Sequence, residues 1–510
     1  MWSLEKHPFP LYNSNLMSVL WHFFDLFRPQ FCYDELLHFI DYSHFLSMSQ
    51  TTPHRALQPE YRLLVLLVSI GFFMQALDTT IVNTAIPAMA AHLQEDPLNM
   101  HSVVVAYVLA VAACIPLSGW LADRFGVRNT YFAAIVIFTL ASLGCGLSQS
   151  LNQLLFFRII QGIGGALLLP VGRLAMLKLI PRDQFLSAMS LMSLAGLIGP
   201  LIGPTLGGWL VEVATWHWIF LINLPMGILG ILVTLKALPN ATEPSVKTFD
   251  LSGFLWLVVA MVGLSLGIES FASPKHGHWQ GLALVGLGLL STAIYAYHAH
   301  THENALFRSR LFQNKIYAIG ILGNFFARLG GNALPFLLPL MLQVAFHFEP
   351  FVTGLLMIPA VLGSLASKPL VRPVIQKLGY RRVLIINTLL VGSCIASFAL
   401  TTADTPLWLR TLHFFIFGIL NSTQFVAMNT FTLKDLSQQN ASSGNSFLSM
   451  IMMLSMSIGV ALAGTLVNLF TAHYGVEQVT TAFHLTLICL GAINIITAAV
   501  FWQIPKNSTL

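Results

Sequence analysis

The sequence predicts an all-α polytopic membrane protein, and three observations support this prediction. Hydrophobic residues make up 56% of the 510-residue chain and charged residues 9%, whereas a soluble domain contains about 25% charged residues. The apolar residues form fourteen long segments joined by short loops. Basic residues concentrate in alternate loops, which is typical of a protein with both termini in the cytoplasm.

Each apolar segment is long enough to cross the hydrocarbon core of a bilayer as a helix, which takes about 20 residues. The connections between the segments leave no room for a soluble domain. Counted in order, the predicted spans are residues 63–89, 101–121, 130–148, 153–176, 186–211, 216–235, 251–272, 279–298, 316–345, 351–367, 383–401, 406–427, 445–470 and 480–503.

The loops predicted on the cytoplasmic side contain nearly all of the basic residues that lie between spans. The loops on the opposite side contain only Lys275. Because cytoplasmic loops are enriched in Lys and Arg, this pattern predicts the orientation and an even number of spans. The cytoplasmic set consists of Arg124, Arg128, Lys178, Arg182, Lys236, Lys247, Arg308, Arg310, Lys315, Lys368, Arg372, Lys377, Arg381, Arg382, Lys434 and Lys506.

The spans divide the chain into five predicted parts. The first sixty residues mix aromatic and charged residues and lack the compact apolar core of a signal peptide. They form either an interfacial amphipathic segment or an untranslated leader ahead of a start at Met48. The parts are an extension at residues 1–60, a six-helix bundle at 61–237, an inserted two-helix hairpin at 250–298, a second six-helix bundle at 316–503 and a cytoplasmic tail at 504–510.

Several classes of function are not indicated by the sequence. The five cysteines have no paired spacing, so neither a disulfide framework nor a metal site is predicted. His298, His300 and His302 stand close together at the cytoplasmic end of the eighth span, where we expect a solvated linker rather than a metal site. The sequence has no Gly-x-x-x-x-Gly-Lys-Ser/Thr loop that would indicate ATP-driven pumping. We expect no cofactor, no nucleic-acid partner and no enzymatic activity.

Asp78 stands in the middle of the first span, within the sequence LDTTIVNTAIP. A charged and unpaired carboxylate at membrane depth costs several kcal/mol, so such a residue indicates a functional site. We expect Asp78 to carry a proton. Arg158 in the fourth span lies about 27 Å from the cytoplasmic end of its helix, against about 22 Å for Asp78, at 1.5 Å per residue. The two side chains are therefore candidates for a pair at similar depth.

The loop between the second and third spans reads GWLADRFGVRN from Gly119 onward. Gly119 permits a close approach of helices, and Gly126 permits a tight turn. Asp123 can accept hydrogen bonds from a helix amino terminus that faces it. Anchoring at the membrane surface would account for Arg124 and Arg128, but it does not require an acid and glycines at fixed offsets.

This loop resembles the signature Gly-x-Leu-Ala-Asp-Arg-x-Gly-x-Arg/Lys of the major facilitator superfamily. The resemblance implies a major facilitator fold, with two six-helix bundles plus two inserted helices, and a loop that latches the two halves on the cytoplasmic side. A degenerate copy at residues 371–382 keeps glycine and basic residues but has no acid in place of Asp123. We therefore expect two related halves, with the coupling residues in the first.

Two further motifs resemble those of proton-driven exporters in this superfamily. The fourth span contains RIIQG from Arg158, similar to an Arg-x-x-Gln-Gly motif that is associated with proton transfer. The fifth span contains an exporter-like motif, although Ser190 replaces the glycine that often begins it. Glycines four residues apart on one helix face permit close helix contact, and a generic packing face is the alternative interpretation. The motif residues are Gly199, Gly203, Pro204, Gly207 and Gly208.

The fourteen spans and the LDTTIVN sequence together resemble the fourteen-spanner drug:proton antiporters. This resemblance implies export of small amphipathic compounds against proton entry, across the inner membrane of a bacterium, by a chain that functions as a monomer in the lipid bilayer. A narrow exporter of an endogenous metabolite or siderophore would share every motif. The exporter-like glycines disfavour an uptake symporter. The similarity does not extend to residues 1–57.

Polar side chains within the spans are candidates for a substrate cavity. Asn324, Arg328 and Asn332 lie at i, i+4 and i+8 on one face of the ninth span. An arginine in a membrane almost always faces the protein interior or water, but a hydrogen-bonded packing seam would also explain this face. Glu269, near the outer end of the seventh span, is expected at the protein surface. The candidate cavity residues are Asn83, Asn324, Arg328, Asn332, Asn421 and Gln424.

Overall fold

The computed structural model describes residues 58–239, 248–271 and 278–505 of the chain. Most of the predicted extension and of the tail lies outside these residues. Thirteen helices in the described part are long and apolar enough to cross a membrane. One of them, Pro350–Leu400, contains Gly379 in a non-helical conformation and so covers two predicted spans. Each of the fourteen predicted spans therefore coincides with a helix, which confirms the prediction of an all-α polytopic membrane protein.

The first bundle contains six spans, and local sequence signals mark where some of its helices begin. Pro59 opens the first helix, where a missing N–H group costs no hydrogen bond. Ser150 caps the fourth span by accepting a hydrogen bond from the backbone N–H of Gln153. The bundle consists of α4 (Pro59–Leu93), α5 (His101–Cys114) with α6 (Leu117–Phe125), α7 (Val127–Gly146), α8 (Leu151–Leu179), α9 (Arg182–Val213), and α10 (Trp218–Leu221) with α11 (Asn223–Ala237).

The inserted hairpin and the second bundle complete the described chain. Asn314 caps the first helix of the second bundle by accepting a hydrogen bond of 3.0 Å from the backbone N–H of Ile316. The hairpin consists of α12 (Leu251–Ser270) and α13 (His278–Thr301), and the second bundle of α14 (Lys315–Val344), α15 (Pro350–Ser397), α16 (Leu407–Leu433), α17 (Gln438–Tyr474) and α18 (Val479–Phe501).

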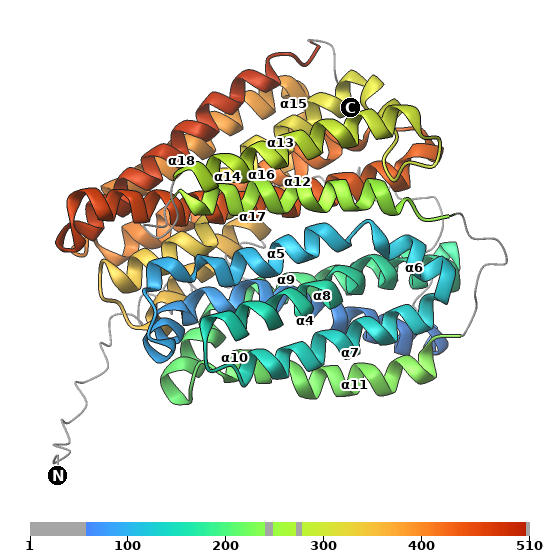
Figure 1. Ribbon diagram of the computed structural model, residues 1–510, viewed down its shortest axis with the longest axis horizontal. Helices are drawn as coiled ribbons and strands as arrows, with labels where there is room; N and C mark the ends of the chain where they lie inside the picture. Colours follow the sequence, from blue (N-terminus) through green and yellow to red (C-terminus); the bar gives the residue numbers. More distant parts are fainter. Residues whose placement is uncertain (1–57, 240–247, 272–277, 506–510) are drawn as a thin grey trace, which may run out of the picture. The chain divides into compact units, whose positions relative to one another are not determined.

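Equivalent helices are in contact in the two bundles. In the first bundle α4 packs on α9, and α7 packs on α8 and α11, as Figure 1 shows for α7 and α11. In the second bundle α14 packs on α17, and α15 packs on α16 and α18. Between the bundles, α9 packs on α15 and α5 packs on α17. Each bundle therefore offers its second and fifth spans to the other, as expected for two related halves.

The turn predicted in the loop between the second and third spans occurs in both halves. Gly126 has φ 84° and ψ 152°, and Gly379 has φ 72° and ψ 157°. A side chain rarely adopts a positive φ of this kind, so glycine is required at both turns. The degenerate copy of the loop thus preserves its backbone conformation although it lacks the acid.

Two groups of the inserted hairpin differ from expectation. Glu269 is only 24% exposed at its side chain and lies 3.5 Å from the Nε2 atom of His101, because α12 packs against α5. His298 is 11% exposed and lies 2.9 Å from Asp250, because α13 continues to Thr301. Glu269 is therefore partly buried rather than fully at the surface, and His298 is paired with Asp250, whereas His300 and His302 are exposed as expected.

Hydrogen bonds join the two bundles near the ends of the helices opposite the basic loops, which we call the outer end. Thr205 of α9 donates to the carbonyl of Gly354 over 3.1 Å. Gln343 of α14 donates to the carbonyl of Thr84 over 3.1 Å. The carboxylate of Glu212 accepts a hydrogen bond of 2.8 Å from the backbone N–H of Phe351. These contacts hold the halves together at the outer end.

Candidate functional site

Asp78 and Arg158, which the sequence predicts to lie at similar depth in the membrane, are in direct contact. The Nη1 atom of Arg158 on α8 lies 2.6 Å from the Oδ2 atom of Asp78 on α4. The carboxylate residue is 0% exposed and the arginine 1% exposed. Removing one partner of a buried ion pair leaves an uncompensated charge and costs about 3–5 kcal/mol. The two charges therefore depend on each other.

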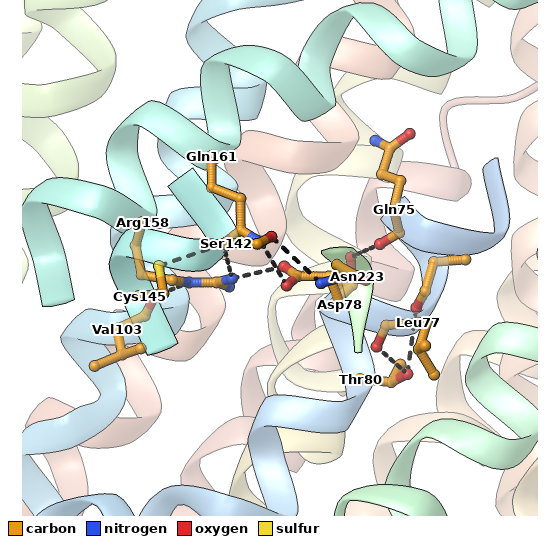
Figure 2. Close-up of polar contacts among 12 residues, drawn as sticks. Gln75, Leu77, Asp78, Thr80, Val103, Ser142, Cys145, Arg158, Gln161 and Asn223 are labelled. Atoms are coloured by element: carbon orange, nitrogen blue, oxygen red, sulfur yellow. Dashed lines mark hydrogen bonds and ion pairs between the residues drawn. The ribbon is translucent and has the colours of Figure 1, made fainter. Parts of the chain in front are cut away.

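Gln161 holds both members of this ion pair. Its Nε2 atom donates to Asp78 Oδ1 over 2.8 Å, and its Oε1 atom accepts from Arg158 Nη1 over 2.7 Å. The same amide nitrogen also donates to Ser142 of α7 over 2.7 Å. Figure 2 shows Asp78 turned toward Arg158 and Gln161, with Ser142 next to Gln161. Both oxygens of the carboxylate are thus hydrogen-bonded.

Arg158 has further partners on α5. Its Nε atom donates to the carbonyl of Val103 over 3.3 Å. Its guanidinium carbon lies 4.2 Å from the centre of the Tyr107 ring, within range of a cation–π interaction. The guanidinium is therefore held by α5 as well as by the carboxylate on α4.

The other side of α4 faces the exporter-like glycines of α9. A Cβ atom at Gly199 would lie 2.8 Å from the backbone nitrogen of Leu77. A Cβ atom at Gly203 would collide with Thr80, and one at Gly207 with the carbonyl of Ile81. The close contact expected of these three glycines is therefore present, and they pack on the segment of α4 that carries Asp78.

The remaining two residues of this motif, Pro204 and Gly208, lie among the contacts at the outer end. The carbonyl of Pro204 accepts a hydrogen bond of 3.1 Å from Thr84 of α4. A Cβ atom at Gly208 would collide with the carbonyl of Pro350 in the second bundle. One motif thus contacts the helix of Asp78 and the opposite half of the protein.

The loop at residues 119–128 is arranged differently from expectation at two positions. In the described part of the chain, no atom outside the adjacent residues and the backbone of the same helix lies within 4 Å of the position that a Cβ of Gly119 would occupy. The expected close helix approach is therefore not made in this conformation. Asp123 lies 3.6 Å from Lys178 of its own half. Arg124 lies in the last turn of α6, Gly126 makes the turn, and Arg128 lies in the first turn of α7.

The polar face of the ninth span lies mainly against α16. Arg328 donates to Asn324 over 2.9 Å and to Asn429 over 3.0 Å, and its guanidinium carbon lies 4.3 Å from the centre of the Phe425 ring. Asn324 also donates to Thr432 over 3.0 Å. These contacts form a hydrogen-bonded seam between α14 and α16.

The other cavity candidates are spread over the second bundle. Gln424 is 2% exposed and bonded to Asn387 and Thr388, at 2.7 Å and 2.6 Å. Asn332 and Asn421 are half-buried. The sequence-predicted polar residues therefore do not gather at a single site.

A cavity of about 120 Å³ lies between the two bundles, and of the predicted polar residues only Asn83 lines it. Its walls come from α4 and α9 on one side and from α14, α15 and α16 on the other. Among the residues that the structure describes, no group of three His, Cys, Asp or Glu residues is placed to hold a metal ion.

Sequence reasoning did not single out four residues of the ion-pair site: Gln161, Ser142, Tyr107 and Asn223. The glutamine stands in the RIIQG motif and was therefore visible as a signal. Asn223 begins α11 and donates to Ser142 over 3.4 Å. Ser142 and Tyr107 are ordinary residues of apolar helices, so only the packing of α5 and α7 against α8 reveals them.

Comparison with known proteins gives consistent results. The family model described as Major Facilitator Superfamily matches residues 68–299 and 320–509. The MdtD protein of Pectobacterium carotovorum is 49% identical over 451 residues, which cover 87% of this chain and 97% of that protein. The MdtD protein of Escherichia coli is 48% identical over 447 residues, covering 87% and 94%. Both relatives are provisionally named multidrug resistance proteins.

Solved structures share the fold at low sequence identity. The POT family transporter PepTSo superposes with a TM-score of 0.65 at 14% identity, covering 88% of this chain and 98% of that chain. A nucleoside transporter, NupG, gives a TM-score of 0.61 at 15% identity, covering 86% and 99%. Identities this low support the arrangement of helices alone.

Proposed function

Because the chain belongs to the major facilitator superfamily, we propose that it exports small amphipathic molecules in exchange for protons, by alternating access. The observation that supports this proposal most directly is the buried ion pair between Asp78 and Arg158. A carboxylate that is 0% exposed inside a membrane helix needs either a counter-charge or a proton. We assign the proton-binding role to Asp78.

Protonation of Asp78 would remove the charge that attracts Arg158. The guanidinium would keep its contacts with Val103, Tyr107 and Gln161, so it would not lose all of its partners. The link between α4 and α8 would weaken, while the link between α5 and α8 would persist. Protonation would therefore release α4 selectively.

A movement of α4 would be transmitted to the rest of the transporter. Its other side packs on Gly203 and Gly207 of α9, and Thr84 bonds both to α9 and to Gln343 of the second bundle. A shift of α4 would therefore disturb contacts that close the outer end. In the proposed cycle a proton from outside releases these contacts and substrate leaves; deprotonation toward the cytoplasm restores them.

The gating role of the loop at residues 119–128 follows from the same cycle. Gly119 has open space around it in the present conformation, in which hydrogen bonds join the two halves at the outer end. We propose that the halves approach each other at this loop when the outer end opens. Asp123 would then exchange Lys178 for a partner on the other half.

Two related functions compete with this one. A narrow exporter of an endogenous metabolite or siderophore would use the same cycle, and a screen of transported compounds separates the two. An uptake symporter would move substrate and proton in the same direction. We further propose that the protein lies in the inner membrane of a bacterium and functions as a single chain.

The decisive experiment measures proton-driven efflux from everted membrane vesicles and proton release from the purified protein on addition of candidate compounds. We expect Asp78→Asn to abolish both signals. Asp183→Asn is the matched control, because this exposed carboxylate lies in the first turn of α9, and the variant should behave like the wild type. Undiminished efflux by the Asp78→Asn protein would refute the proposal, and inward co-transport of substrate with protons would favour the symporter.

A further inference from the structure

The cavity between the bundles has a distinct chemical character. Pro204 of α9, Leu338 of α14, Met357 of α15 and Phe417 of α16 are among its apolar walls. Among the residues described, no Asp, Glu, Lys, Arg or His side chain lines it. A ligand part that enters this space therefore finds apolar surface and no charge to pair with.

Asn83 supplies the polar group of the cavity that is free to bind. The side chain is 2% exposed, and its Oδ1 atom is buried without a hydrogen-bond partner. Buried polar side-chain atoms nearly always have a partner, so an orphan in a cavity wall indicates a missing ligand or water. Thr80, the other polar residue of the wall, already donates to the carbonyls of Ala76 and Leu77 over 3.2 Å and 3.1 Å.

Asn83 and Asp78 point in different directions. They are five residues apart on α4, and a rotation of about 100° per residue separates their side chains by about 140° around the helix. Asp78 is bonded to Arg158 and Gln161 of α8 and does not line the cavity. The ion pair and the unpaired amide therefore lie on separate faces of one helix.

We propose that the cavity binds an uncharged apolar molecule that carries a hydroxyl or amide N–H group, and that Asn83 Oδ1 accepts the hydrogen bond from that group. This inference rests on the proposed export function, which it makes more specific by naming the substrate class. Substrate and proton share no residue in this arrangement. Coupling between them passes through α4, and a positive charge on the substrate is not required.

Binding of two matched probes to the purified protein tests this inference. The probe 2-naphthol carries a hydroxyl donor, and 2-methoxynaphthalene has the same ring system without the donor. Both are uncharged at neutral pH and fluorescent. Because a hydrogen bond to a buried acceptor contributes about 1.4 kcal/mol, we expect wild-type protein to bind 2-naphthol about tenfold more tightly.

Three variants complete the experiment. Asn83→Leu has a similar side-chain size but no acceptor, so it should bind the two probes with equal affinity. If that variant does not fold, Asn83→Ser replaces it; its shorter hydroxyl group still accepts a hydrogen bond and should retain part of the preference for 2-naphthol. Asn152→Leu, at an exposed asparagine on α8, should retain the full preference.

The outcomes separate this inference from the proposed function. Equal affinities of the two probes for the wild type, no saturable binding of either, or an unchanged preference in Asn83→Leu would overturn the substrate site proposed here. These measurements use a single pH and no gradient, so they do not depend on proton coupling. Proton-driven efflux by Asp78→Asn would instead overturn the export mechanism and leave a measured probe preference valid.

Discussion

Gln161 donates a hydrogen bond of 2.8 Å to the Oδ1 atom of Asp78, so the carboxylate that pairs with Arg158 is held at both of its oxygens. The same side chain accepts from the arginine. The pair is therefore a three-residue unit, in which the orientation of both charged groups depends on an uncharged amide.

We predict that Gln161→Leu slows proton-driven efflux about tenfold, because a hydrogen bond to a charged group contributes about 1.5–3 kcal/mol. The change removes a donor to the carboxylate and an acceptor for the guanidinium without altering either charge. Efflux from everted vesicles at a fixed pH gradient measures the effect. Gln153→Leu, at an exposed position on the same helix, serves as the control. Equal rates for the two variants would show that Gln161 has no part in coupling.

We predict that Gly207→Ala destabilises the protein by about 1–3 kcal/mol, because the added methyl group meets the carbonyl of Ile81 and backbone cannot swing aside. Gly119→Ala should leave the melting temperature unchanged, since the position of its methyl group is open. Thermal unfolding of the purified variants in detergent provides the comparison. Similar losses of stability in both would contradict the assigned packing.

The contact between Glu269 and His101 predicts a role for the inserted hairpin at the outer end. Thr465 of α17 donates to the carbonyl of Ile268 over 3.2 Å, so α12 contacts both bundles beside this pair. Glu269→Gln should weaken the junction and increase the population of molecules that are open to the outside. Distances between spin labels at the outer ends of α5 and α17 would then broaden toward larger values.

The control for that measurement is Glu303→Gln, at an exposed carboxylate beyond the end of α13 that is opposite the outer end. It should leave the distance distribution unchanged. A Glu269→Gln protein with the same distribution as the wild type would show that the hairpin does not hold the outer end closed.

Asp250 predicts a dependence of stability on pH. Burial tends to raise the pKa of its carboxyl group, but hydrogen bonds from the backbone of Gly253 and Leu306, together with His298, lower the pKa overall. A carboxyl group with a lowered pKa in the folded state stabilises the protein above its unfolded pKa of about 3.9 and loses this effect as the pH falls through the folded value.

We therefore expect Asp250→Asn to lower the melting temperature by about 2 °C at pH 7 and to differ less from the wild type below about pH 4. Melting curves of both proteins across this pH range measure the difference. A difference in melting temperature that stays constant with pH would assign the role of Asp250 to helix capping alone.

The sequence was sufficient for the helices and for the depth of the ion pair, because both follow from apolar length and a fixed rise per residue. It was not sufficient to predict which way a side chain points around its helix axis, because the helices are apolar on nearly every side. Asn83 and Arg328 were equal candidates for the cavity, yet one lines it and the other bonds across to α16. The partial burial of Glu269 could not be predicted either, since the approach of α12 to α5 involves residues far apart in sequence.

The conformation at Gly119 was unpredictable for another reason. The motif is the same in every state of the transport cycle, whereas the space around a residue belongs to one state. Sequence motifs of a moving protein therefore describe contacts that need not exist together.

Within the described part of the chain, the side chains that hydrogen-bond to Asp78 or Arg158, and the rings that lie beside the guanidinium, all belong to the first six-helix bundle. The walls of the apolar cavity, by contrast, are shared with α14, α15 and α16. The two halves thus have different roles. The first contains the whole proposed proton-binding unit, and the second supplies much of the surface that a transported substrate would contact. Substitutions in the second half can therefore change substrate specificity while the proton-coupling residues of the first half stay the same.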